Sequence, residues 1–245
     1  MNGAAGLLAA KVALGPVLLP QAKWLRRNAL RLPEAAGPRE GQVGDGEPVL
    51  RLLVLGDSSA AGVGVADQAQ ALALPLARAV SQRMGAAVRW QLVARTGINT
   101  LEARALIRRV ALQPADAVVT ALGVNDVTSQ TAAARFVDET ALLWSDLQQF
   151  TGARWAVFCG LPPMHLLRPV PHPLRWYLGR YAAWLDGSLR AWTQERGLGY
   201  CALGWASDPS SLADDGFHPG AGLYPEWSAR LADLLFAGCT RWARP

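Results

Sequence analysis

Short, mostly apolar runs alternate with longer amphipathic segments along most of the chain. Five such runs from residue 50 onward predict strands: Leu50–Leu55, Val88–Val93, Ala117–Leu122, Trp155–Cys159 and Tyr200–Leu203. Apolar residues at helical spacing predict helices over Ala69–Met84, Thr100–Ala111, Ala132–Phe150, Pro173–Arg196 and Pro225–Phe236. Largely apolar strands that are each followed by a helix indicate a parallel sheet covered on both faces. The expected fold is therefore α/β, a three-layer α/β/α sandwich.

The first predicted strand ends abruptly in Gly56-Asp57-Ser58, which is followed by small residues. This pattern is typical of a buried strand that runs into a tight turn and exposes one serine. Asp57 is expected to fix the turn through side-chain-to-backbone hydrogen bonds. Gly97 and Asn125 also come just after predicted strands. Because sites in parallel sheets lie outside the carboxyl ends of the strands, we expect Ser58, Gly97 and Asn125 at one rim.

A serine hydroxyl is a weak nucleophile, so Ser58 needs a general base and a site for the oxyanion. Near the C-terminus, Asp215 and His218 stand three residues apart, a spacing that suits a short turn bending the carboxylate onto the ring. Imidazole titrates near neutral pH and can accept and return the serine proton. The other two histidines, His165 and His172, lack an aspartate at this spacing and are expected to be loop residues.

Serine, glycine, asparagine and histidine in this order and in these local contexts resemble the SGNH (GDSL-type) esterase and lipase superfamily. The matching blocks are Gly56-Asp57-Ser58-Ser59, Gly97, Gly123-Val124-Asn125-Asp126 and Asp215-Gly216-Phe217-His218-Pro219. They lie within a span from roughly Leu50 to Leu235. The first block lacks the leucine of the family's four-letter name. The resemblance implies five strands in a flavodoxin-like order.

By the same resemblance, Ser58 is the nucleophile, His218 is the general base and Asp215 orients the imidazole. The oxyanion would be held by the backbone N–H groups of Ser58 and Gly97 and by the side-chain amide of Asn125. Two simpler interpretations stay open. Gly97 could serve an ordinary strand-to-helix turn, and Asn125 could be a helix N-cap.

Other nucleotide-binding, hydrolase and metal motifs do not fit the chain. Ala61 stands where a phosphate loop would need glycine, and no lysine follows it. Ala60 breaks the G-x-S-x-G pattern of α/β-hydrolases, and the H-E-x-x-H motif is absent. The three cysteines lack C-x-x-C spacing, which argues against a zinc site. We therefore expect neither a metal nor an organic cofactor.

The net charge of +5 is distributed unevenly along the chain. Residues 1–40 contain six Lys or Arg and two Glu, whereas residues 41–245 contain 18 basic and 17 acidic residues. A nucleic-acid enzyme would carry its basic excess on the catalytic domain itself. The expected partner is therefore a small-molecule ester and not a nucleic acid, and the oligomeric state stays open.

We divide the chain into an apolar and basic helical arm (1–31), a Pro- and Gly-rich linker (32–49) and an SGNH hydrolase domain (50–245). In the arm, Lys11 and Pro16 interrupt an apolar stretch that lacks a clear cleavage site. An interfacial helix followed by basic residues fits best, while a membrane span, an export signal and a helix packed on the domain stay open. The basic residues favour the cytoplasmic side, so we expect a cytoplasmic enzyme that can associate with the inner membrane face.

Residues 160–176 form the longest irregular stretch of the domain and contain five prolines. They follow the fourth strand, so they are expected to overhang the rim and shape the acyl or alcohol pocket, with a plain surface loop as the alternative. These features favour a serine hydrolase that cleaves carboxylic esters, preferably with short acyl chains, through an acyl-enzyme. The alternatives are a carbohydrate O-deacetylase, a non-catalytic binding module on the same fold and a membrane-attached scaffold.

Overall fold

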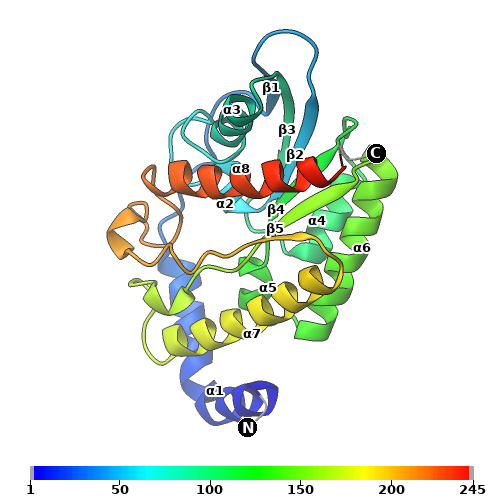
Figure 1. Ribbon diagram of the computed structural model, residues 1–245. Coiled ribbons are helices and arrows are strands. Elements are labelled where there is room, and N and C mark those ends of the chain that lie inside the picture. Colours follow the sequence, from blue (N-terminus) through cyan, green and yellow to red (C-terminus); the bar gives the residue numbers. More distant parts are fainter. Residues whose placement is uncertain (1–2, 243–245) are drawn as a thin grey trace.

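The computed structural model describes residues 3–242, and Figure 1 shows a twisted sheet flanked by helices. Within these residues, six strands form one sheet in the order β1-β3-β2-β4-β5-β6. The strands are β1 (Glu40–Val43), β2 (Leu50–Gly56), β3 (Val88–Ala94), β4 (Ala117–Ala121), β5 (Trp155–Cys159) and β6 (Gly199–Cys201). The longer helices are α1 (Gly3–Asn28), α3 (Ala73–Met84), α4 (Thr100–Ile107), α6 (Ala133–Thr151), α7 (Leu174–Glu195) and α8 (Leu223–Trp242). Short helical turns are α2 (Ser58–Ala61), α5 (Val124–Thr128), η1 (Met164–Leu166) and η2 (Pro209–Ser211).

The five predicted strands are all present, are mutually parallel and follow the flavodoxin-like order. The expectation of a five-stranded sheet is nevertheless wrong, because a sixth strand, β1, pairs antiparallel with β3. This strand lies within residues 32–49, which were expected to be a linker only. Its sequence, EGQV, has no apolar run, so the hydrophobic pattern did not predict it. An edge strand whose side chains are exposed does not need such a run. Backbone pairing from Glu40↔Gln91 to Val43↔Val88 decides its place.

Successive side chains along a strand point to opposite faces of the sheet, so they contribute to two separate cores, one on each face. In β2, Leu53 and Leu55 point into one core, and Leu52 and Val54 point into the other. The first core is covered by α4, α6 and α7, and the second by α3 and α8, as Figure 1 shows. Because both faces of β2 are covered, its run of apolar residues is nearly continuous, as expected for a central parallel strand.

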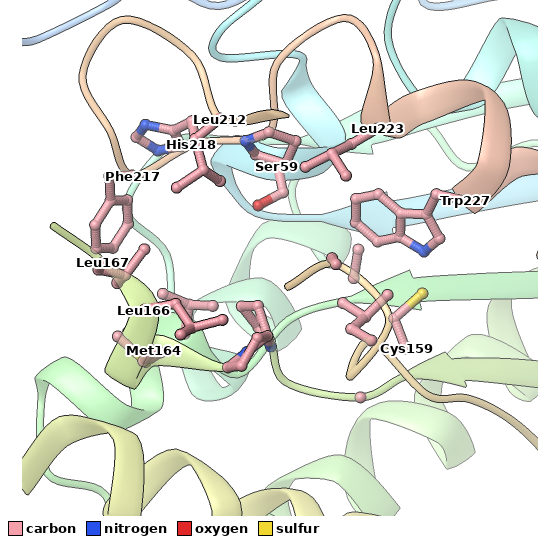
Figure 2. Close-up of a pocket in the computed structure, with 18 of the residues that line it drawn as sticks. Ser59, Cys159, Met164, Leu166, Leu167, Leu212, Phe217, His218, Leu223 and Trp227 are labelled. Carbon is pink, nitrogen blue, oxygen red and sulfur yellow. The ribbon is translucent and has the colours of Figure 1, made fainter. Parts of the chain in front are cut away.

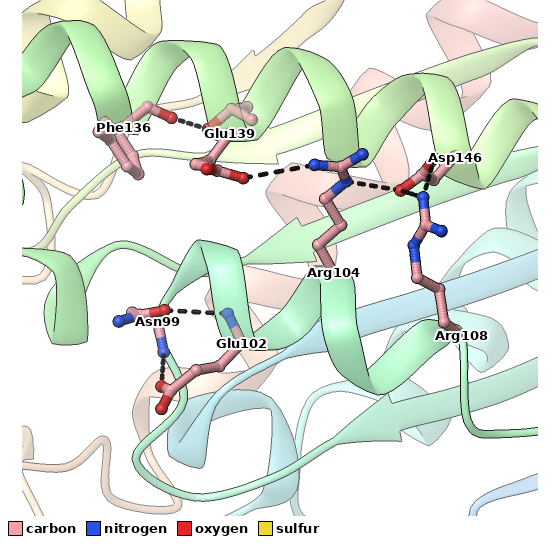
Figure 3. Close-up of polar contacts among 8 residues, drawn as sticks. Asn99, Glu102, Arg104, Arg108, Phe136, Glu139 and Asp146 are labelled. Atoms are coloured by element: carbon pink, nitrogen blue, oxygen red, sulfur yellow. Dashed lines mark hydrogen bonds and ion pairs between the residues drawn. The ribbon is translucent and has the colours of Figure 1, made fainter.

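Ion pairs join α4 to α6 on the first face, and a capping box closes the start of α4 (Figure 3). Arg104 Nε and Arg108 Nη2 lie 2.6 Å and 2.8 Å from Asp146 Oδ2. At the other end of α4, Asn99 and Glu102 form a reciprocal capping box. The cap defines where α4 begins, and it therefore also sets the position of the short loop between β3 and α4.

Candidate active site

The turn after β2 places Ser58 at the carboxyl edge of the sheet. Ser58 begins α2, and the Asp57 side chain accepts a hydrogen bond from Ser59 N at 3.0 Å. Gly56 leaves no room for a side chain, because a Cβ there would lie 2.4 Å from Ala60 Cβ and 2.8 Å from the Ala121 carbonyl oxygen. The predicted role of Asp57 in fixing the turn is confirmed.

Ser58, His218 and Asp215 form one hydrogen-bonded relay. Ser58 Oγ lies 2.9 Å from His218 Nε2, and His218 Nδ1 lies 2.5 Å from Asp215 Oδ2. An ionised carboxylate only accepts hydrogen bonds, so the Nδ1 proton belongs toward Asp215 and Nε2 can accept the serine proton. The fold thus brings together residues that are 160 positions apart in the chain.

The turn from Asp215 to His218 is held by its own hydrogen bonds. Asp215 Oδ1 accepts from Phe217 N at 2.9 Å and from His218 N at 3.0 Å. Burial raises the pKa of Asp215, but hydrogen bonds from the His218 ring and from these two backbone groups outweigh burial and leave the pKa below its ordinary value. The carboxylate is therefore ionised at neutral pH and suited to stabilise an imidazolium.

Asn125 lies in α5, just past β4, and both hydrogens of its amide have acceptors. Its Nδ2 lies 3.0 Å from the Ile98 carbonyl oxygen and 3.2 Å from Asp57 Oδ2. Gly123 is the N-cap of α5, so the interpretation of Asn125 as a helix N-cap is wrong. The amide instead ties the turn of the nucleophile to the loop that follows β3.

Gly97 lies in that loop with φ of +83°, a left-handed conformation that glycine adopts at little cost. Its backbone N–H donates to no acceptor among residues 3–242. The Ser58 N–H stands at the first position of α2, where no intrahelical acceptor exists. Of the three expected oxyanion donors, two are therefore unpaired within the described chain, and Asn125 is engaged.

Two buried carboxylates, those of Asp57 and Asp126, adjoin Ser58 and Asn125 in the chain. Burial raises the pKa of Asp57 to about 6, although hydrogen bonds from Ser59 act in the opposite direction. Asp126 accepts hydrogen bonds from Thr100 N at 3.0 Å and from Thr100 Oγ1 at 2.8 Å. Asp126 thereby joins α5 to the start of α4.

A largely apolar pocket opens beside Ser58 and His218, with a cavity volume of about 80 Å³. Figure 2 shows Met164, Leu166 and Leu167 on one wall, opposite Leu212 and Leu223. The lining includes Gly160, Pro162, Pro163, Met164, Leu166 and Leu167, which confirms that the proline-rich loop shapes the pocket. His172 lies in a loop, as predicted, whereas His165 lies in η1, and neither residue lines the pocket.

A family model described as the GDSL-like lipase/acylhydrolase family matches residues 54–235, about three quarters of the chain. This chain belongs to that family. No curated protein matches the chain in sequence.

Solved structures share the fold of this GDSL-like acylhydrolase at low identity. The psychrotrophic esterase EstA from Pseudoalteromonas sp. is 16% identical with a TM-score of 0.59, over 78% of this chain and 98% of its own. The lipase Lip_vut3 from a goat rumen metagenome is also 16% identical, with a TM-score of 0.60 over 76% and 97%. A carbohydrate esterase family 2 enzyme from Corynascus thermopiles is 15% identical, with a TM-score of 0.58 over 81% and 69%.

Part of the GDSL-like pocket could not be found by reading the sequence. Leu203 and residues 205–209 line the cavity, as does Trp227 of α8, which Figure 2 shows near Cys159. Neither segment carries a motif, and an apolar residue at helical spacing in α8 predicts only a core position. Their place in the pocket follows from β6 lying next to β5 and from α8 packing against both strands, which no local pattern encodes.

Within residues 3–242 of this GDSL-like protein, no group of three or more His, Cys, Asp or Glu side chains is arranged to hold a metal ion. Cys159 and Cys201 are free, buried thiols on neighbouring strands.

Proposed function

We propose that this chain hydrolyses carboxylic esters through an acyl-enzyme on Ser58. The observation that carries the proposal is the relay from Ser58 Oγ through His218 to Asp215, with distances of 2.9 Å and 2.5 Å. A protein that only binds a ligand has no need for a serine aligned with a base and an orienting carboxylate. Membership of an acylhydrolase family supports the same reaction class.

In the first half-reaction, Ser58 Oγ attacks the ester carbonyl carbon while His218 Nε2 takes the hydroxyl proton. The carbonyl electron pair moves onto oxygen and forms a tetrahedral oxyanion. When that intermediate collapses, the bond to the alcohol oxygen breaks, and His218 delivers its proton to the departing alcohol. Ser58 is left as an ester of the acyl group.

In the second half-reaction, a water molecule replaces the alcohol. His218 takes one proton from the water as its oxygen attacks the acyl carbon, and the proton returns to Ser58 Oγ when the carboxylic acid leaves. Throughout both halves, Asp215 stays ionised and stabilises the charged imidazole.

For the oxyanion we propose three donors: the backbone N–H groups of Ser58 and Gly97 and the amide of Asn125. The two backbone groups are unpaired within residues 3–242. Asn125 has to give up one acceptor, and the 3.2 Å contact with Asp57 is the longer of its two. Catalytic hydrogen bonds often tighten only when substrate is bound, so this rearrangement is compatible with the role.

The pocket supports a preference for short acyl chains. Its cavity of about 80 Å³ is much smaller than the roughly 300–1,000 Å³ typical of pockets for larger ligands. Its lining is mostly aliphatic and aromatic, which suits a small hydrocarbon group. A carbohydrate O-deacetylase is the second candidate, because an acetyl group also fits this volume and one structural neighbour is named a carbohydrate esterase.

We propose a cytoplasmic location, with the domain held on the inner side by the basic residues that follow the apolar segment. By length and composition, residues 5–28 of α1 could cross a membrane, and an export signal near an N-terminus passes the same test. Fractionation of the host cells distinguishes these cases. Protein in the medium or periplasm, trimmed near Leu19 to Lys23, would identify an export signal and refute a cytoplasmic location.

The function is tested with nitrophenyl esters from acetate to palmitate, alongside acetylated xylan. The full chain should turn over the short esters fastest, and Ser58→Ala should abolish turnover. Ser59→Ala provides the matched control in the same turn. Turnover that survives in Ser58→Ala, or none in the unmodified chain, would overturn the proposal. Faster release of acetate from xylan than from nitrophenyl acetate would favour the deacetylase.

A further inference from the structure

Helix α1 has two apolar faces, and only one of them is covered. Leu7 and Leu18 are buried in the core that includes α7, and Leu14 and Leu25 pack against the same core. A second stripe, four and seven residues apart along the helix, points outward. It consists of Leu8, Val12 and Leu19, which are 64%, 73% and 74% exposed.

A basic segment continues the outward stripe of α1. Lys23, Arg26 and Arg27 are exposed in the last turns of the helix, and Arg31 is exposed just beyond it. Residues 3–33 contain no Asp or Glu, whereas the domain after residue 40 is nearly balanced in charge. An apolar stripe next to uncompensated positive charge complements a bilayer that carries anionic headgroups.

Contacts along α1 favour a helix lying flat over one that spans the bilayer. The Gln21 side chain donates to the His172 carbonyl oxygen at 2.6 Å and accepts from Leu174 N at 3.1 Å. The covered face of α1 packs against α7, and Figure 1 shows α1 as a bent helix whose later turns run beside the domain while its N-terminal turns lie below α7. A spanning helix would have to break these contacts, whereas a flat helix keeps them and buries only the outer stripe.

We propose that α1 lies in the plane of an anionic membrane surface and binds it through the outward stripe. Leu8, Val12 and Leu19 enter the interface, and the basic residues after them contact the headgroups. Gln21 joins α1 to the loop that lines the pocket, and Glu34 accepts hydrogen bonds from Thr96 N and Oγ1, next to Gly97. Docking through α1 therefore brings the rim of the pocket close to the bilayer. This inference does not depend on the ester hydrolase reaction.

The test is cosedimentation of the full chain with vesicles made of equal parts phosphatidylglycerol and phosphatidylcholine, compared with pure phosphatidylcholine. Binding should require the anionic lipid and weaken as salt is added. The triple variant Leu8→Gln/Val12→Gln/Leu19→Gln should bind more than about tenfold more weakly. The triple variant Lys23→Gln/Arg26→Gln/Arg27→Gln should lose about a hundredfold.

The matched control is Val49→Gln/Leu101→Gln/Leu142→Gln, which removes three exposed apolar side chains that lie outside α1. This control should bind vesicles like the unmodified chain. Both α1 variants should keep the circular dichroism spectrum and the thermal unfolding midpoint of the unmodified chain, which shows that they fold whether or not the chain hydrolyses esters. Equal binding to both vesicle types, or full binding by the Leu8, Val12 and Leu19 variant, would overturn the proposal. Bound protein that resists extraction by alkaline carbonate would show a spanning helix instead and would also overturn it.

Discussion

The two sides of Ser58 differ in how far they are prepared for reaction. On the side of the base, Ser58 Oγ, His218 and Asp215 already form the hydrogen bonds that proton transfer requires. On the oxyanion side, the amide of Asn125 is engaged with Ile98 and Asp57. The proposed proton route is thus preorganised, whereas the proposed anion site would be completed when the substrate oxygen replaces one of these acceptors.

The difference follows from how each side is built. The base side depends on one local turn, in which Asp215 Oδ1 accepts two backbone N–H groups from within three residues. The oxyanion side combines groups from three strand ends, those of β2, β3 and β4. Groups on separate elements need mutual contacts to stay in register, and Asn125 supplies those contacts in the absence of an oxyanion.

The largest effect should come from breaking the base side. Ser58→Ala should lower kcat/KM on a short ester by about 10⁴-fold or more, because the nucleophile is lost while the fold remains. Ser59→Ala should change kcat/KM far less, since the substitution keeps the Ser59 backbone N–H that donates to Asp57 at 3.0 Å. Steady-state kinetics on nitrophenyl butyrate measure both variants. A dead Ser59→Ala beside an active Ser58→Ala would show that the nucleophile is misassigned.

The second-largest effect tests whether the Asn125 amide exchanges one of its two acceptors for the oxyanion. Asn125→Ala should reduce kcat by about 10²–10³-fold with little change in KM, the usual cost of one oxyanion donor. The split between kcat and KM is the measurement that matters. A large rise in KM at unchanged kcat would instead make Asn125 a substrate-binding residue. No change in either would leave it as the structural tie seen here.

The third prediction concerns Asp57, the acceptor that Asn125 would give up. Burial raises its pKa from 3.8 to about 6, so between these values the folded protein holds more protons than the unfolded chain. The contribution of Asp57 to the free energy of unfolding therefore falls as pH rises through this window. Relative to Asp57→Asn, the unmodified chain should lose about 1–3 kcal/mol across it.

Urea unfolding of both chains over that pH range tests the prediction for Asp57. The pKa of Asp215 shifts in the opposite direction: it is lowered in the fold, so the stabilising effect of Asp215 is lost as pH falls. Asp215 is present in both chains, so its contribution cancels in the difference. A difference in unfolding free energy that does not vary with pH would contradict a raised pKa for Asp57.

The smallest effect tests whether the cavity lined by Met164 is the pocket for the acyl chain. Met164 is buried and lines the cavity, so Met164→Ala should enlarge it and raise the ratio of octanoate to butyrate turnover by about threefold or more. Leu147→Ala removes a fully buried side chain that does not line the pocket. Both should cost about 2–5 kcal/mol in stability, but Leu147→Ala should leave the ratio unchanged. A higher kcat/KM on palmitate than on butyrate in the unmodified chain would refute the short-chain preference.

Much of the site was readable in the sequence because its signals are local. Apolar runs located the five parallel strands, and the glycine and small residues after the first run marked the turn that carries Ser58. The spacing of Asp215 and His218 encodes a turn whose hydrogen bonds close within three residues. Such features depend on neighbouring side chains and backbone, so a short window of sequence contains them.

Other features depend on contacts between distant segments, and only the tertiary structure decided them. Strand β1 exists because β3 offers a free edge, not because EGQV favours a strand. Asn125 faces Ile98 and Asp57 because three strand ends meet, and Trp227 reaches the pocket because α8 packs against β5 and β6. The sequence by itself determined which residues could react. The long-range packing decided which of them are already paired, since burial and hydrogen-bond partners are properties of the folded chain.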